Sequence, residues 1–295
     1  MDENLSHLAK LKELHTLALC KANTATTGSG FQITGEGLQY VLFRLPKLKS
    51  LTLHAINGLK FNLSTALTPP KDDNGLISLK ENRRKKSKMQ IDHPLKQLRL
   101  QTLKLPFSLN FPLSEVALEQ LQSVTYLSLQ ESYLLRRRDL NSTDVTRIFK
   151  RLHNVRKLDL SCSNCQNVVL SNLPPGVEWL ELRDCYSVSV LGIHSLSRSV
   201  GSNLKYLGLS FCNRLSASLV SAFDKLFPKL EGLDLSCCRS VGDVHVKTFN
   251  NMKRLTYLRL VGCTKLSEES VKIARIESAN RLFIIGPKYV NNYKK

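Results

Sequence analysis

The six-residue pattern L-x-x-L-x-L, in which Val, Ile or Ala can replace a Leu, recurs along the whole chain and restricts the possible folds more than any other feature. We call it the leucine motif. From Val155 onward its copies follow one another at 22 to 27 residues, so one short structural unit is repeated many times. The motif copies begin at Leu14, Leu48, Leu95, Val124, Val155, Val177, Leu204, Leu230, Leu255 and, in weaker form, Ala279.

The spacing inside the motif predicts a short β-strand. Leu207 and Leu209 are two residues apart and therefore point to one face of the strand, while Tyr206, Gly208 and Ser210 point to the other face. One unit alone has too few leucines to form a core. Neighbouring units must stack so that their leucines are buried together.

The segments between the motifs are predicted to be short helices. Apolar residues recur at helical spacing after Ser216, and Ser216, Asp243 and Ser267 are predicted N-caps. Repetition of strand, turn and helix predicts an α/β solenoid of about ten units. It would be curved, with a parallel sheet on the concave face and helices on the convex face.

The repeats extend from end to end, so we expect residues 1–295 to form a single domain. Residues 68–94 carry prolines and many charges without periodicity, which predicts a disordered basic insertion within the second unit. Residues 286–295 form a predicted basic C-terminal tail. An insertion of this kind belongs in a loop and leaves the stack of repeats intact.

The net charge is +19, which favours acidic partners without establishing one. Two short basic runs suit a nuclear-import signal or an acidic contact, and a solvated loop explains them equally well. No stretch has the roughly 18 apolar residues of a membrane span or the pattern of a signal peptide. We therefore expect an intracellular protein, cytoplasmic, nuclear or both, without membrane contact. The basic runs contain Arg83, Arg84, Lys85, Lys86 and Lys88, and Arg136, Arg137 and Arg138.

Four cysteines stand three residues after the last leucine of their motif: Cys185, Cys212, Cys238 and Cys263. Other motifs have Ala, Ile or Ser at this position, so it needs a small or apolar side chain, which a buried cysteine supplies. A zinc site normally combines two closely spaced pairs of ligands, and the Cys162–Cys165 pair has no companion. Disulfides are not expected without a secretory signal. We predict no metal site and no cofactor.

No catalytic motif occurs in the chain: the histidines lack metal-ligand spacing, and there is no nucleophile elbow or phosphate-binding loop. The chain is therefore predicted not to be an enzyme. Binding is instead predicted on the concave face, where Tyr, Trp and Arg, the usual interface anchors, flank the leucines. The candidate partner-binding residues are Tyr126, Asp159, Trp179, Glu181, Arg183, Tyr206, Asp234, Tyr257 and Arg259.

The charge of this predicted face is mixed, whereas a nucleic-acid groove should be more uniformly basic. A protein partner is therefore favoured over nucleic acid. An alternative without any partner is that the aromatic side chains only stack across neighbouring strands.

Units of this length that end in cysteine, followed by short segments such as NRLSAS (213–218) and TKLSEES (264–270), resemble the cysteine-containing subclass of leucine-rich repeats. That subclass is best known from F-box and leucine-rich-repeat proteins, the substrate receptors of cullin-type ubiquitin ligases, and from relatives without an F-box. The resemblance implies substrate recognition for ubiquitin ligation, with ligase components as partners.

The first motif begins at Leu14, which leaves no room upstream for an F-box, a helical module of several dozen residues. In a ligase the chain would thus act as a fragment, as an F-box-less relative or through another adaptor. Two other functions stay open. One is a structural subunit of a larger assembly, and the other is a basic nuclear protein that associates with RNA or chromatin.

Overall fold

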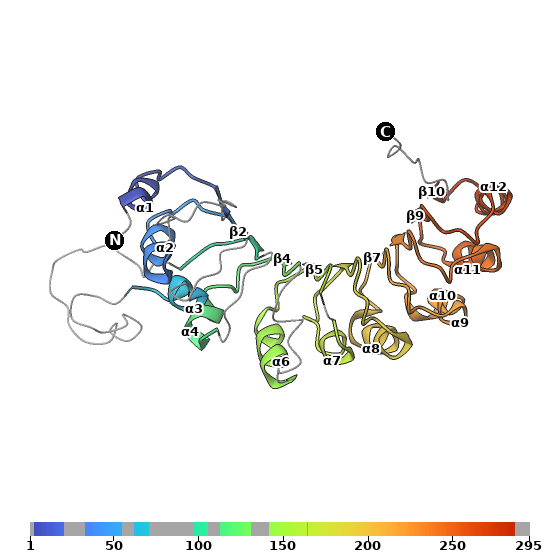
Figure 1. Cartoon of the computed structure of the whole chain (residues 1–295), viewed down its shortest axis with the longest axis horizontal. Coiled ribbons are helices and arrows are strands. Elements are labelled where there is room, and N and C mark those ends of the chain that lie inside the picture. The colour runs from blue at the N-terminus through green and yellow to red at the C-terminus, as the bar shows by residue number, and fades with distance from the viewer. Residues whose placement is uncertain are drawn as a thin grey trace, which may run out of the picture. The chain divides into compact units, whose positions relative to one another are not determined.

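The computed structural model describes residues 3–20, 33–54, 62–70, 97–105, 113–130, 142–163 and 165–286. The chain divides into two compact parts, residues 1–125 and 126–295, which we call the N-terminal part and the C-terminal part. In both parts the strands are parallel, and their order in the sheet is their order in the chain (Figure 1).

The N-terminal part contains three described strands, with Leu51 in register with Leu17 on one side and Leu103 on the other. All three of these leucines are buried, so the leucine motifs of this part share one core. Helices α2 and α3 pack side by side, α1 lies against α2, and α4 lies against α3. The elements are α1 (Glu3–Leu8), β1 (Thr16–Cys20), α2 (Gly35–Leu42), β2 (Ser50–His54), α3 (Leu63–Leu67), β3 (Thr102–Lys104) and α4 (Glu115–Glu119).

The C-terminal part shows the predicted alternation most clearly. Figure 1 shows its strands along the inner side of an arc and its helices along the outer side. The prediction of an α/β solenoid is confirmed. The strands are β4 (Tyr126–Ser128), β5 (Lys157–Asp159), β6 (Trp179–Glu181), β7 (Tyr206–Gly208), β8 (Gly232–Asp234), β9 (Tyr257–Arg259) and β10 (Phe283–Ile285). The helices are α6 (Ser142–Arg151), α7 (Asn167–Leu170), α8 (Val190–Val200), α9 (Ala217–Val220), α10 (Phe223–Leu226), η1 (Asp243–His245), α11 (Val246–Asn251) and α12 (Glu268–Glu277).

The core of the C-terminal part is a ladder of aligned motif leucines. Leu180, Leu207, Leu233 and Leu258 occupy equivalent positions on successive strands, and each is 0 % exposed. Fully burying one such side chain contributes about 1.5–3 kcal/mol. The leucine motif therefore sets both the register of the sheet and most of its hydrophobic core.

Two of the ten predicted motif positions are wrong. The register Leu51↔Leu103 shows that the third motif begins at Leu100 and not at Leu95. The register Leu258↔Ile284 likewise moves the last motif from Ala279 to Arg281. In both segments apolar residues stand at several alternating positions, so the pattern alone allows two frames. Pairing with the neighbouring strand selects one of them.

Two of the three predicted N-caps are confirmed. Ser216 Oγ accepts a hydrogen bond from the Leu219 amide, and Ser267 Oγ accepts one from the Ser270 amide. The prediction for Asp243 is wrong, because Gly242 is the N-cap and Asp243 is already inside η1. The Asp243 carboxylate instead accepts the Ser267 amide at 2.7 Å and so joins two neighbouring repeats.

One residue in each regular repeat of the C-terminal part has left-handed backbone geometry. Four of the repeats have a cysteine three residues after the last motif leucine, namely Cys185, Cys212, Cys238 and Cys263, which we call the motif-linked cysteines. The left-handed residue stands directly before this position, where the chain leaves the sheet. A glycine adopts this geometry without steric cost, whereas any other residue is strained there. The residues are Cys162, Asp184, Phe211, Cys237 and Gly262, with φ between 54° and 72°.

The predicted insertion and tail lie largely outside the described residues. Thr68 is the C-cap of α3 and Pro69 is buried, so the predicted insertion begins inside the packed structure; residues 71–94 are not described. Of the predicted tail, only Gly286 is described. Among the described helices, none is both long enough and apolar enough to cross a lipid bilayer.

Candidate functional site

The concave face of the C-terminal part carries two rows of side chains, each with one residue per strand. We call the first the aromatic row and the second the acidic row. Strand pairing aligns the residues within each row. The aromatic row consists of Tyr126, Lys157, Trp179, Tyr206, Gly232, Tyr257 and Phe283, and the acidic row consists of Ser128, Asp159, Glu181, Gly208, Asp234, Arg259 and Ile285.

Most of the rings of the aromatic row contact one another across the strands. Trp179 and Tyr206 are stacked with their ring centroids 4.9 Å apart and an interplanar angle of 9°. Tyr126 meets Trp179 edge-on at 6.5 Å, and Tyr257 stacks on Phe283 at 6.2 Å. Stacking across strands, the alternative without a partner, is thus present. Trp179 and Tyr206 are nevertheless only half-buried, so part of the stack stays open to solvent.

Two glycines make room for the larger side chains beside them. A Cβ atom at Gly232 would lie 2.8 Å from Cδ2 of Tyr206, so the tyrosine ring lies directly over this glycine. Gly208 gives the same space to the Glu181 carboxylate. Prediction from the sequence missed both glycines as contributors to the site. The sequence does contain a sign of them, because Gly208 and Gly232 have no side chain at positions where other repeats have charged or aromatic residues.

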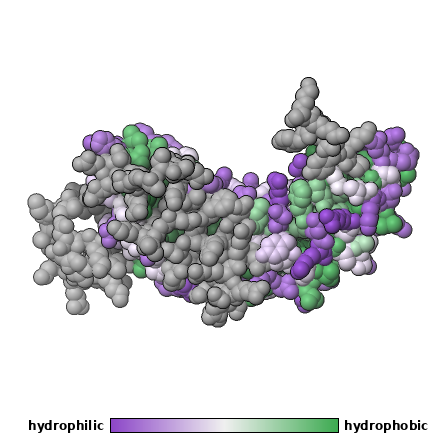
Figure 2. All heavy atoms as spheres, in the orientation of Figure 1, coloured by the Kyte–Doolittle hydropathy of each residue, from purple (hydrophilic) through white to green (hydrophobic). Residues whose placement is uncertain are grey.

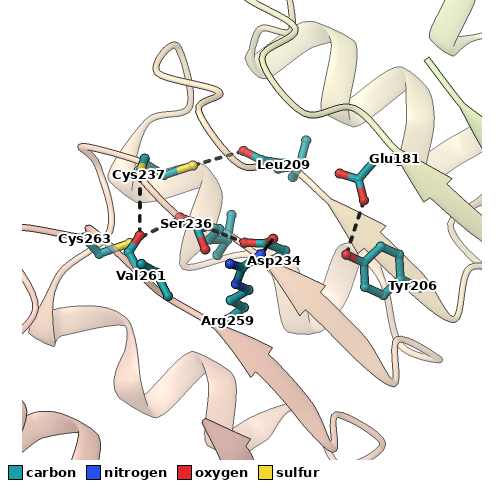
Figure 3. Close-up of polar contacts among 11 residues, drawn as sticks. Glu181, Tyr206, Leu209, Asp234, Ser236, Cys237, Arg259, Val261 and Cys263 are labelled. Atoms are coloured by element: carbon teal, nitrogen blue, oxygen red, sulfur yellow. Dashed lines mark hydrogen bonds and ion pairs between the residues drawn. The ribbon is translucent and has the colours of Figure 1, made fainter. Parts of the chain in front are cut away.

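Glu181 lies between Asp159 and Gly208 in the acidic row. The hydroxyl of Tyr206 donates a hydrogen bond to its Oε2 at 3.3 Å (Figure 3). Burial and then the negative charges of Asp234 and Asp159 raise the pKa of Glu181 to about 7, although the Tyr206 hydroxyl and Arg183 act in the opposite direction. Burial and the Glu181 charge in turn raise the pKa of Tyr206. The site therefore holds a carboxyl group that changes charge near neutral pH.

Asp234 has a different environment from Glu181, because a cation of the next strand reaches it. Arg259 Nη1 lies 3.5 Å from Asp234 Oδ2, and the Asp234 side chain is only 7 % exposed. Figure 3 shows the Arg259 side chain beside Asp234. Asp234 Oδ1 also accepts the Ser236 amide at 2.8 Å. Asp159 makes the equivalent contact, because its Oδ1 accepts the amide of Ser161, two residues further along the chain, at 3.0 Å.

The remaining predicted site residues lie at the borders of the two rows. Arg183 is exposed at the end of β6, and its guanidinium lies 5.6 Å from the centroid of the Phe211 ring. Tyr257 is half-buried against Phe283, a concave-face ring that the candidate set omitted. The structure thus brings the predicted residues of β4 to β9 onto one face, in two rows of different chemistry.

The four motif-linked cysteines lie in the core and away from this face. Each thiol donates a hydrogen bond to the carbonyl oxygen of the last motif leucine in the preceding repeat, at 3.1 to 3.2 Å. Burial raises the pKa of Cys238 to about 12 and that of Cys263 to about 11. Within the described residues, no three His, Cys, Asp or Glu side chains are grouped so that they could hold a metal ion. The cysteines are therefore structural.

The helical side offers exposed apolar residues that come from separate repeats. Leu191, Val244 and Ile276 are 68 %, 77 % and 75 % exposed, respectively. Figure 2 shows hydrophilic side chains over much of the α11 and α12 end, with smaller hydrophobic areas between them. Both predicted basic runs, residues 83–88 and 136–138, lie outside the described residues.

No protein-family model and no curated protein matches the sequence. Solved structures do match it. The leucine-rich repeat-containing protein LegL7 of Legionella pneumophila is 15 % identical with a TM-score of 0.55, and the match covers 95 % of this chain and 77 % of LegL7. Rad7, solved in complex with Elc1 in yeast, is 16 % identical with a TM-score of 0.51 over 97 % of this chain and 71 % of that chain.

A third structure, TLR13 in complex with ssRNA13, is 18 % identical with a TM-score of 0.52 and covers 97 % of this chain but 34 % of that chain. At such low identity the likeness concerns the fold and not the activity. The repeated motif, the aligned strands and these similar structures lead to one conclusion. The chain has the leucine-rich-repeat fold.

Proposed function

We propose that the chain is a non-catalytic protein-recognition module whose partner binds the two rows of the concave face. The observation that carries this proposal is the Trp179–Tyr206 stack. It places two large, half-exposed rings on a sheet whose leucines hold it rigidly from below. Rigid aromatic side chains lose little conformational entropy on binding and often anchor interfaces.

Two comparisons bear on the class of partner. Rad7 was solved with a protein, Elc1, and TLR13 with a single-stranded RNA. The mixed charge of the concave face supports the first class, because a nucleic-acid groove should be more uniformly basic. Substrate recognition for a cullin-type ubiquitin ligase, implied by the repeat resemblance, is the cellular role we propose for this surface.

The test is affinity purification with the full chain and three variants, with partners quantified by mass spectrometry. Trp179→Ala and Tyr206→Ala remove the stack, while Leu191→Ala is the matched control, since Leu191 is an exposed apolar residue on α8. We expect the two stack variants to lose the partner and the control to retain it. Retention of every partner by both stack variants would refute the proposal. Co-purification of cullin-ligase components tests the ligase role separately.

Association with RNA or chromatin is the second candidate, supported by the net charge of +19. Deletion of residues 71–94 tests it and spares Thr68 and Pro69, which belong to the packed end of α3. Loss of nucleic-acid binding or nuclear entry, with binding at the concave face intact, would assign that activity to the basic insertion.

A further inference from the structure

The acidic row places carboxylates on neighbouring strands in a strongly basic chain. Asp159 and Glu181 are directly in register on β5 and β6, and Asp234 lies two strands further along. Like charges directly opposite each other on neighbouring strands destabilise a sheet. A cation between the carboxylates reduces this repulsion.

For one of these acids the fold itself supplies the cation. Arg259 stands opposite Asp234 in the register of β8 and β9, and the two side chains form an ion pair. The residue in the equivalent position opposite Glu181 is Gly208, which has no side chain. Among the described residues, no Lys, Arg or His lies within ion-pair distance of Asp159 or Glu181. Glu181 therefore has the geometry of Asp234 without its arginine.

A separate observation concerns a buried hydroxyl near Asp234. Alternation along the chain places Ser236 on the same side as Asp234, two residues away, and Ser236 is 5 % exposed. Its hydroxyl has no hydrogen-bond partner among the described residues. Buried hydroxyl groups are normally paired. Beside Asp234, at the edge of the acidic row, one buried polar group therefore lacks a partner among the described residues.

The aromatic row lies directly beside the carboxylates of the acidic row. The Tyr206 hydroxyl contacts Glu181, and the Tyr206 ring stacks on Trp179, so the carboxylate and the two rings line one place on the face. Lys and Arg side chains bind favourably over aromatic faces, and their charged ends pair with carboxylates. This chemistry fits a long basic side chain and does not fit an acidic or phosphorylated one.

We propose that the partner of the concave face inserts an Arg or Lys side chain beside Glu181, in the place that Arg259 occupies beside Asp234, with its stem against the Trp179–Tyr206 stack. The inference rests on the proposed function and adds the chemical class of the partner. The occupant is a basic segment of another protein.

The titration of Glu181 gives this contact a pH dependence. The charged and titratable groups around it are Asp159 and Lys157 on β5, Arg183 following β6, Tyr206 on β7 and Asp234 on β8. With a pKa of about 7, Glu181 is mostly ionised at pH 8 and mostly protonated at pH 6. Binding of a cation favours the ionised form, so affinity should rise from pH 6 to pH 8.

The experiment uses a phage-displayed library of random 12-residue peptides, selected on the full chain at pH 8. Selected peptides are then synthesised with a fluorescent label, and their Kd is measured by anisotropy. Trp179→Ala tests the face itself, and Leu191→Ala is the control. Glu181→Gln removes the charge and keeps the acceptor for Tyr206.

We expect peptides that require Trp179 to be rich in Arg or Lys and to bind Glu181→Gln at least tenfold more weakly than the wild type. Replacing the key Arg of the peptide by Met should cost as much as Glu181→Gln. The two changes together should cost little more, because both remove the same contact.

The failures of the two proposals are distinguishable. Peptides that require Trp179 but lack basic residues, or bind Glu181→Gln unchanged, would overturn the basic-segment inference and leave the recognition face in place. Basic peptides that bind without Trp179 or Glu181 would overturn it as well. If no selected peptide requires Trp179, both the inference and the proposed function are wrong.

Discussion

The thiol of Cys212 donates a hydrogen bond to the carbonyl oxygen of Leu182 in the preceding repeat, with Sγ and O 3.1 Å apart. Cys185, Cys238 and Cys263 make the same contact with Leu160, Leu209 and Leu235. The periodic cysteine thus links each repeat to the one before it. It fills the core and also satisfies a carbonyl group where the strand ends.

Replacing Cys212 by Val should keep the site apolar and filled, at the cost of one added methyl group, but lose this hydrogen bond. We expect a loss of unfolding free energy of about 1 kcal/mol, and a loss of about 2 kcal/mol for Cys212→Ala, which also leaves a cavity. Urea unfolding followed by circular dichroism measures both. Cys20→Val is the control, because Cys20 is exposed and should tolerate the change. A Val variant as stable as the wild type would show that the thiol contributes only packing.

Burial should protect the four motif-linked thiols from modification. Each is 0 % exposed, and burial raises the pKa values of Cys212, Cys238 and Cys263. The hydrogen bond with Cys165 lowers the pKa of Cys185, so that thiol is protected by its burial alone. Because the thiolate is the reactive form, iodoacetamide at pH 8 should label Cys20 in the native protein and label these four only after unfolding. Peptide mass spectrometry reports each site separately. Labelling of Cys212 at the rate of Cys20 would contradict the assignment of a structural role.

Ala279 directly follows Ser278, the C-cap of α12, and has a left-handed φ of 51°. Glycine adopts this geometry without steric cost, so Ala279→Gly should stabilise the protein by about 0.5–1 kcal/mol. The matched control is Lys272→Gly inside the same helix, where glycine should destabilise by a similar amount. In thermal unfolding we expect the Tm to rise for Ala279→Gly and to fall for Lys272→Gly. Destabilisation by both changes would show that Ala279 is not strained.

Glu181→Gln should alter how stability depends on pH. The folded-state pKa of about 7 lies above the ordinary value of 4.5, so the folded protein binds more protons than the unfolded chain between these values. The wild type should therefore lose stability as pH rises from 5 to 8, and the Gln variant should lose less. The difference between the variants should change by roughly 1–2 kcal/mol over this range. Urea unfolding at each pH measures the unfolding free energy of both proteins. If it changes with pH by the same amount in the wild type and in the Gln variant, the pKa of Glu181 lies near its ordinary value.

The sequence predicted most of the fold because the leucine motif repeats a single physical requirement. Each copy must bury its leucines against its neighbours, and eight of the ten predicted motif starts agree with the strand register. The two errors share a cause. Apolar residues at alternating positions around Leu100 and Ile284 allow more than one frame, and only the neighbouring strand selects among them.

The candidate site was predicted as a set of residues, and their relationships were not. Alternation along a strand is enough to assign Trp179, Glu181 and Arg259 to the concave face. It does not show that Tyr206 stacks on Trp179, that Arg259 neutralises Asp234, or that the position in register with Glu181 on β7 is a glycine and not a cation. These contacts join residues that are about 25 positions apart in the chain.

By itself, then, the sequence determined the repeat, the buried leucines, the structural place of the cysteines and the face that each strand turns to solvent. These features depend on periods of two residues and of one repeat, which can be read along the chain. Only the tertiary structure decided that, among the described residues, Asp234 forms an ion pair while Glu181 has a tyrosine hydroxyl as its partner. That depends on the register between strands, which places Gly208 opposite Glu181 and Arg259 opposite Asp234.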